Sequence, residues 1–244
     1  MNATKIRISI LSVCAAVFIP VFSGMILPPD LKPIAMIMKV IQEDVSRKTP
    51  TSDWQKAKRG DPLASKDMVR TGVGSFAVVK FNDNTLLKIR PNSVITIFGE
   101  IAQSTFSKSV DLSKGSVDFD VAKQRAKEKF EFTTPTSVAS IRGTNGRFQT
   151  DSDSTDYLFI NSGLAELLNL VTNQSLQVAG GQVGISHKSG LIEVRVMTHD
   201  ELNTMTETGQ LRNSPELEKQ EFEMDFKDNQ DNPHKLKIEV QKPK

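Results

Sequence analysis

Histidine, cysteine and carboxylate side chains carry most metal binding and acid–base catalysis, and this chain has few of them in a useful arrangement. The three histidines, His187, His199 and His234, lie in separate segments without the spacing of a metal site. The only cysteine, Cys14, lies in an N-terminal apolar run, so the rest of the chain has no disulfide or thiolate site. We therefore expect no metal site and no cofactor.

Carboxylate pairs and glycine-rich loops give no stronger signal for catalysis. Asp151 and Asp153 are close in sequence, but residues 150–154 have the composition of an exposed turn. A calcium loop would need more acidic residues and a defined glycine. No phosphate-binding loop, nucleophile elbow or zinc motif occurs. The prediction is that the protein has no catalytic residues and is not an enzyme.

Two segments could face a ligand, although each has a structural interpretation. The basic stretch Lys123–Lys129 is either a ligand-facing patch or a solvated loop. In the second segment Gly143 allows a sharp bend, and the Thr144 hydroxyl can close that bend with a local hydrogen bond. Arg142 offers several donors to carbonyls or to a carboxylate. The structural interpretation is favoured for both segments.

The elements that must position these residues are strands, because a ten-residue pattern recurs between about residues 65 and 190. Each copy has two apolar residues, a turn-forming residue and two further apolar residues, and an odd number of positions separates the two pairs. On one straight strand the pairs would face opposite ways, so a bend is needed to bring both to one core. The predicted bends lie at Gly74, Asn92, Gly115, Gly163 and Gly181. The residues expected to face the shared core after a bend include Phe76, Val94, Val183 and Ile185.

A weaker copy, with Phe130, Phe132 and Pro135, lies among these five and is out of step in its second half. The segment Asn82–Thr85 separates two apolar strands and predicts a hairpin turn. The predicted fold is all-β, with short strands stacked as in a β-solenoid or a β-sandwich, followed by a short helix and a C-terminal β-hairpin.

Residues 1–27 are predicted to be an export signal or a membrane anchor. An uncharged run, residues 8–27, follows Lys5 and Arg7, which is typical of a signal peptide. About 20 apolar residues also suffice to span a bilayer, so an uncleaved membrane anchor is the alternative. In both cases the remainder is predicted to be exported, as a periplasmic, cell-surface or secreted domain or one held outside the inner membrane.

The last segment, residues 191–244, predicts a C-terminal extension. Residues 191–197 alternate as one more strand, and Thr198 followed by Glu201 predicts a capped helix to about residue 208. Residues 222–226 and 236–240 both have period two, which predicts a hairpin with one apolar face. Because an isolated hairpin is marginal in water, we expect it to dock on the main domain or on a partner.

The charge balance does not indicate any class of partner. The formal net charge is +2, and Lys5 and Arg7 account for it. No field of one sign is available to attract nucleic acid, or anionic lipid in bulk. We expect no nucleic-acid partner, and membrane contact only through an uncleaved N-terminal helix.

Several short motifs, taken in order, resemble the FecR domain family over about residues 34–190. Two positions depart from the family pattern: Asn84 stands where glycine is usual, and Gly146 where an aromatic residue is common, so that Phe148 is expected to pack there instead. The motifs are Gly60-Asp61, residues 69–72, 75–81, 82–85, 110–115, 130–135, 141–144, 161–163 and 178–181.

The resemblance implies an exported, all-β sensing or interaction module that binds an envelope protein or glycan. In the best-known members a transmembrane helix joins this domain to a cytoplasmic segment that controls a sigma factor. Only about seven residues precede the apolar run here, so we expect no such anti-sigma segment. The alternative is a structural or assembly component of the cell surface or secreted matrix that self-associates through the repeat ends or the terminal hairpin, since exposed strand edges make such pairing easy. An enzyme is a remote alternative.

Overall fold

The computed structural model describes residues 32–206 except 43, 103–104, 124–127 and 152–154, together with the backbone of 218–227 and 233–242. The predicted signal peptide or membrane anchor, residues 1–27, lies outside the described residues. Among the residues that are described, no helix has the length and apolar character needed to cross a membrane.

Most of the described chain is β-strand, with one short helix, which confirms the predicted all-β class. In chain order the elements are β1 (Ala35–Ile41), β2 (Val45–Lys48), β3 (Gln55–Lys56), β4 (Pro62–Leu63), β5 (Met68–Thr71), β6 (Phe76–Phe81), β7 (Leu86–Ile89), β8 (Val94–Ala102), β9 (Thr105–Asp120), β10 (Phe130–Thr133), β11 (Ser137–Ile141), β12 (Asn145–Thr150), β13 (Asp156–Ser162), β14 (Leu164–Asn169), β15 (Ser175–Ala179), β16 (Gln182–Ser186), β17 (Ile192–Val196), α1 (His199–Thr206), β18 (Glu218–Lys227) and β19 (Pro233–Lys242).

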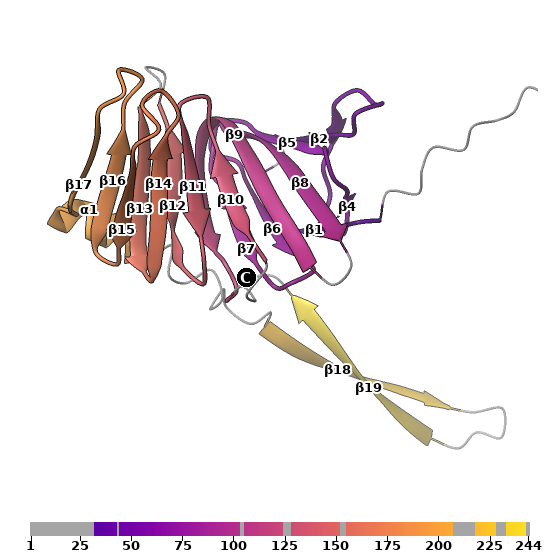
Figure 1. Cartoon of the computed structure of the whole chain (residues 1–244). Helices are drawn as coiled ribbons and strands as arrows, with labels where there is room; N and C mark the ends of the chain where they lie inside the picture. The colour runs from indigo at the N-terminus through magenta and orange to yellow at the C-terminus, as the bar shows by residue number, and fades with distance from the viewer. Residues whose placement is uncertain are drawn as a thin grey trace, which may run out of the picture. The chain divides into compact units, whose positions relative to one another are not determined.

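Strands β1 to β17 pair into two layers that share the long strand β9 (Figure 1). Layer A has the order β4-β1-β6-β7-β9-β12-β13-β16-β17. Layer B has the order β3-β2-β5-β8-β9-β10-β11-β14-β15. The first part of β9, up to Lys114, pairs with β8 in layer B, and its last residues pair with β7 and β12 in layer A.

The bends between the layers, apart from the connection after β9, share one backbone feature, a residue with positive φ. Gly115 is an example: β9 continues through it from one layer into the other with a φ of 91°. Glycine suits such a bend because it has no Cβ to clash in this conformation. The layer-crossing bends with positive φ are at Gln42, Gly60, Lys66, Gly74, Asn92, Gly115, Gly143, Gly163 and Gly181. The predicted bends at Gly74, Asn92, Gly115, Gly163 and Gly181 are all among them.

The predicted facing of the side chains is correct at only two of these five bends. Around Gly115 and Gly163 both apolar pairs are buried in the shared core, as the spacing predicts. After Gly74 and Asn92 the buried residues come one position later than predicted, for example Ala77 instead of Phe76 and Ile95 instead of Val94. These two bends are four residues long, so the length of the bend, not the spacing of the pattern, decides which face turns inward.

The same correction applies after Gly181. Val183 and Ile185 are buried, but in a second cluster with Met197 and Met205 rather than in the main core. Met205 belongs to α1, which contacts β13. The predicted second arm of this copy therefore packs under the helix on the outer face of layer A.

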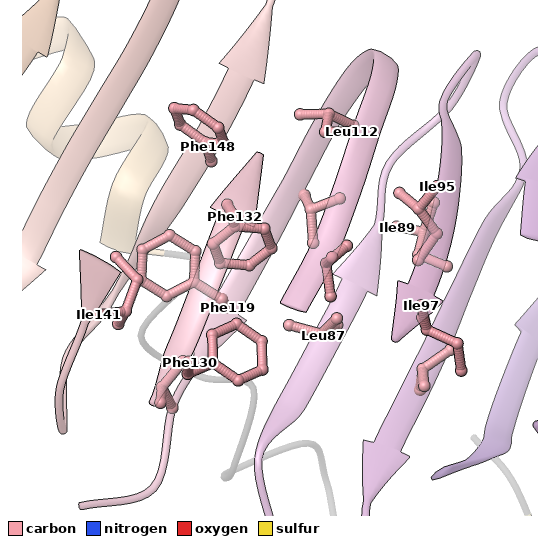
Figure 2. Close-up of a cluster of buried hydrophobic side chains, with 14 of the residues drawn as sticks. Leu87, Ile89, Ile95, Ile97, Leu112, Phe119, Phe130, Phe132, Ile141 and Phe148 are labelled. Carbon is pink, nitrogen blue, oxygen red and sulfur yellow. The ribbon is translucent and has the colours of Figure 1, made fainter. Parts of the chain in front are cut away.

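The main core lies between the two layers and is rich in phenylalanine (Figure 2). The ring of Phe119 in layer A lies 5.1 Å from that of Phe132 in layer B, measured between centroids. Phe148 is fully buried and lies 5.8 Å from Phe132. A Cβ added to Gly146 would meet the Phe119 ring at 2.9 Å, so Phe119 already fills the space beside this glycine.

The copy containing Phe130 and Pro135 is not a crossing between layers, which corrects the prediction for that segment. Phe130–Thr133 and Ser137–Ile141 pair with one another inside layer B, and the chain crosses only afterwards, at Gly143. Strand β10 also runs parallel to β9, unlike its neighbours. The connection after β9 must therefore return to layer B, and this return puts the copy out of step.

A buried carboxylate ties this hairpin to the opposite layer. Asp156 of β13 is fully buried and accepts hydrogen bonds from the hydroxyls of Thr134 and Ser137, each at 2.5 Å. The hydroxyl of Thr136 donates to the same oxygen. A buried carboxylate needs such donors, so Thr134, Thr136 and Ser137 have a structural role.

The three predicted C-terminal elements are present, and the strand predicted at residues 191–197 is β17. Glu201 accepts a hydrogen bond from the backbone N–H of Thr198 at 2.7 Å, and Thr198 Oγ1 accepts one from the N–H of Glu201 at 3.3 Å, which is the predicted capping box. Strands β18 and β19 pair antiparallel, with Phe222 opposite Ile238, as predicted for the terminal hairpin.

Two glycines with similar φ test the importance of the bends. An alanine Cβ at Gly115 would lie 2.7 Å from the Cα of Ser93, whereas one at Gly181 would meet nothing within 4 Å. We expect Gly181→Ala to cost about 1–2 kcal/mol through backbone strain alone, and Gly115→Ala to cost roughly 1–3 kcal/mol more through overpacking. Urea unfolding of both variants measures the difference, and equal losses would contradict the role assigned to the Gly115 bend.

The helix cap predicts a pH dependence confined to α1. Arg195 donates two hydrogen bonds of 2.8 Å to Glu201 and thereby lowers the pKa of this carboxyl from 4.5 to about 2. Because the pKa falls on folding, the stabilisation is complete above pH 4.5 and is lost as the pH falls towards 2. We expect amide exchange in α1 to accelerate across this window, and Glu201→Gln to remove the dependence; an unchanged profile in that variant would rule the cap out as its source.

Candidate binding surface

A row of side chains crosses the outer face of layer B in direct cross-strand register. The row residues lie on the outward-facing side of their strands; Glu131, for example, lies between buried Phe130 and Phe132. Neighbouring strands lie about 4.8 Å apart, so six strands give the row a length of about 24 Å. We call this row the layer-B ladder; its residues are Phe98, Ser109, Glu131, Ser140, Glu166 and Gln177.

Two shallow hollows follow the ladder and share Lys129 and Glu131. The larger, of about 570 Å³, extends from Lys129 across Arg142 to Gln177. The smaller, of about 290 Å³, lies around Phe98. Together they form a groove of mixed polar and apolar character that runs across the strands, with Phe98 at one end.

The charged side chains along this groove are available to a ligand. Within the described part of the chain, the side chains of Lys129, Glu131, Arg142 and Glu166 form no hydrogen bond or ion pair. Both signs of charge therefore lie on this face beside hydroxyl and amide groups. Such a surface suits a polar, extended partner that lies across the strands.

A third hollow, of about 290 Å³, lies on the same face of layer B beside Asp111 and Thr133. Burial raises the pKa of the Asp111 carboxyl above its ordinary value. Thr96 and Thr133 are the cross-strand neighbours of Asp111, so it belongs to a parallel row one step from the ladder.

The segment Arg142-Gly143-Thr144 divides into a structural part and a surface part. The Thr144 hydroxyl is nearly fully buried and lies 3.3 Å from the carbonyl of Arg142, the local bond expected at this bend, and 2.9 Å from the carbonyl of Leu164, which ties the bend to β14. We call this pair of contacts the Thr144 staple. Arg142 is exposed and lines the larger hollow instead of pinning the bend. Sequence reasoning assigned both residues to one role, whereas the bend separates them.

The other residues considered from the sequence are dispersed. His187 is half-buried in the turn before β17, where its Nδ1 lies 3.4 Å from the Thr155 hydroxyl. His199 begins α1 and is exposed. Asp151 accepts a hydrogen bond from the N–H of Thr155, as expected for a turn. In the described residues no group of three or more histidine, cysteine or acidic side chains could hold a metal ion.

The basic stretch Lys123–Lys129 is only partly described. Residues 124–127 lie outside the described residues, and Lys123 is exposed. Its last member, Lys129, lines both hollows of the groove. The ligand-facing interpretation therefore has support at one residue.

A separate hollow of about 200 Å³ lies on layer A between Arg147, Phe159 and α1. Arg147 is held by Asp118, whose Oδ1 accepts its Nε–H at 2.5 Å, while Arg90 donates to Oδ2 at 2.9 Å. Asp118 is buried and needs these two cations, because an unpaired buried charge is costly. The arrangement explains the fold of this face without a ligand.

Substitutions at the bend separate the staple from the surface. Thr144→Val removes a buried donor and leaves the Leu164 carbonyl without its partner, so we expect a loss of about 1–2 kcal/mol in unfolding free energy. Arg142→Glu changes an exposed side chain and should alter stability by no more than about 0.5 kcal/mol. Denaturant unfolding of both variants tests this division. A large loss of unfolding free energy in Arg142→Glu would show that Arg142 helps to hold the bend.

No curated protein is similar enough in sequence to be matched. Two crystal structures of a candidate anti-sigma factor from Parabacteroides distasonis, at 1.65 and 2.50 Å resolution, match with a TM-score of 0.48 and 13% identity. The matches cover 57% of this chain, which spans only 64% and 63% of the length of those chains.

Residues 67–164 match the profile of the family described as FecR protein. The matched range begins just before β5 and ends at the first residue of β14, so it includes β9, β10 and β11, which hold the middle of the ladder. The family is regulatory, which supports a signalling or regulatory module. The chain therefore carries a FecR domain, over residues 67–164.

Proposed function

We propose that this protein is an extracytoplasmic binding module of the bacterial envelope that takes part in signalling and recognises its partner through the layer-B ladder. The partner is an envelope protein or glycan that lies across the strands. The observation that carries the proposal is the continuous groove along the ladder, inside and beside the segment that matches the FecR family.

The chemistry of the groove supports binding rather than catalysis. Catalysis needs a nucleophile or base held within hydrogen-bond reach of a partner group. Glu131 and Glu166 are separated along the ladder by Ser140, one strand from each, and lie about 10 Å apart at ordinary strand spacing. A surface of this kind offers hydrogen bonds and charges along its length, which fits recognition of a polymer.

The N-terminal residues support the proposed location. An uncharged run after Lys5 and Arg7 has the features of an export signal or an anchor, and both would leave the domain outside the cytoplasm. The signal would then be received outside the inner membrane. How it is passed on depends on the partner that the groove recognises.

Site-specific photo-crosslinking in living cells tests the ladder. A photoreactive amino acid is placed at Glu131, Glu166 or Gln177, one at a time, and at Lys80 and Lys88 of layer A as matched controls. We expect a discrete adduct from the ladder positions and none from the controls. Protease treatment of the adduct then distinguishes a protein partner from a glycan.

A charge-reversal variant in the groove completes the test. Arg142→Glu should reduce the yield of the adduct at Glu166 by about tenfold, since a charge reversal beside the groove costs on the order of 1–2 kcal/mol in binding. Equal adducts from both layers, or none from any ladder position, would contradict recognition through layer B. Fractionation of the same cells measures whether the domain is outside the cytoplasm, independently of the groove.

A further inference from the structure

The two ends of the layered body, β1 to β17, differ in how well their inward side chains are covered. At the end formed by β3 and β4, Leu63 is 0% exposed and Ala57 is 3% exposed. At the end formed by β15 and β17, Leu176 is 37% exposed and Val196 is 71% exposed. Both belong to the inward-facing sets of their strands, because Leu176 is opposite buried Leu167 and Val196 shares the face of Val194, which packs on the core.

Further apolar side chains gather around this second end. The Thr172 hydroxyl donates to the carbonyl of Gly190 at 3.3 Å, which holds the turn before β15 against the turn before β17. Val171 and Leu191 lie in these two turns and are each 58% exposed. We call this set the open end; its residues are Leu170, Val171, Leu176, Leu191 and Val196.

An open end of this kind is costly for a stacked β-structure. Its apolar side chains stay in contact with water, and its last strands present unpaired backbone groups to other chains. Stacked architectures therefore end in a capping element that covers the last layer. At the β3–β4 end no further cover is needed, since Leu63 and Ala57 are already buried.

The C-terminal hairpin has a face that matches the open end. Its register puts Met224 opposite Leu236 and Glu223 opposite Lys237, so apolar and charged positions alternate in step on the two strands. By this alternation one face is apolar and the other carries complementary charges. The positions on the apolar face are Phe222, Met224, Phe226, Leu236, Ile238 and Val240.

We propose that the β18–β19 hairpin caps the open end of its own chain, with its apolar face against Leu176 and Val196. The chain leaves α1 at Thr206, and α1 packs through Met205 on β16, the neighbour of β17. Residues 207–217 connect α1 to β18, and eleven residues can span about 36 Å. So short a connection keeps the hairpin at high effective concentration near its own open end, which favours it over the hairpin of a second copy.

Hydrogen exchange on the full-length protein tests the cap. Leu236→Asp combined with Ile238→Asp places two charges on the apolar face of the hairpin. We expect amide exchange in residues 170–179 and 191–196 to accelerate by about tenfold or more, with β6 and β7 unchanged. The matched control is Lys235→Gln with Lys237→Gln, on the same strand and the opposite face, which puts no like charges in register and should leave exchange at the open end as it was.

Two aspartates on the apolar face can also unfold the hairpin itself, so a variant of the open end is needed as a reciprocal test. Val196→Asp alters an exposed residue of the open end and should accelerate exchange in residues 218–227 and 233–242 to a similar extent. Val73→Asp, at a residue that is 80% exposed elsewhere, is its control and should change nothing. Unchanged hairpin exchange in Val196→Asp would overturn the proposal.

Two further readouts identify a different occupant. Light scattering should give a monomer mass, with protection of the open end that does not depend on protein concentration. A dimer whose protection rises with concentration would show that a second copy supplies the cap, which overturns the assignment to the same chain. Cosedimentation with phosphatidylglycerol vesicles that is lost in the Leu236→Asp, Ile238→Asp variant would overturn it in favour of a membrane surface.

Discussion

The positive φ at the bends is the constraint on which both the core and the binding face depend. An extended chain that stayed in one layer would alternate its side chains between two faces and could not place both sides of each bend against one core. Positive φ lets the chain turn from one layer into the other within a few residues, as at Gly115 and Gly163. Phenylalanines from both layers then pack together in the core between the layers, so the outward-facing residues of each layer are not needed for that core.

The same geometry gives the outer face of layer B its character. Buried neighbours fix each strand of this layer from the inside, so the outward residues Glu131, Ser140 and Glu166 are held in register without contributing to the core. A row held in this way is pre-organised, because no backbone rearrangement is needed to present it to a partner. Layer A differs, since α1 and the pairing of Asp118 with Arg90 and Arg147 occupy much of its outer face.

The sequence predicts the class of the fold and the positions of the bends, but not which residues face the core at each bend. The alternation rule holds at Gly115 and Gly163 because those bends occupy a single position. It fails at Gly74 and Asn92, where the longer bends shift the inward face by one residue. Gln42 and Lys66 were missed as bends because neither residue type is typical of positive φ.

The ladder was not predicted, since its members are far apart in the sequence and only the pairing register brings them together. Ser109 and Glu131, for example, are neighbours only because β10 runs parallel to β9. Arg142 was noticed, but its role in the groove depends on which way the chain leaves the Gly143 bend. The terminal hairpin and the capped helix were predictable because both are local in sequence.

The alternation of the chain between two facing layers is tested most directly by nuclear Overhauser contacts between aromatic rings. Phe119 of layer A and Phe132 of layer B have ring centroids 5.1 Å apart across the core. With these two phenylalanines selectively labelled, we expect a strong contact between their ring protons. The absence of that contact in the folded protein would contradict the two-layer arrangement and the exposed ladder that depends on it.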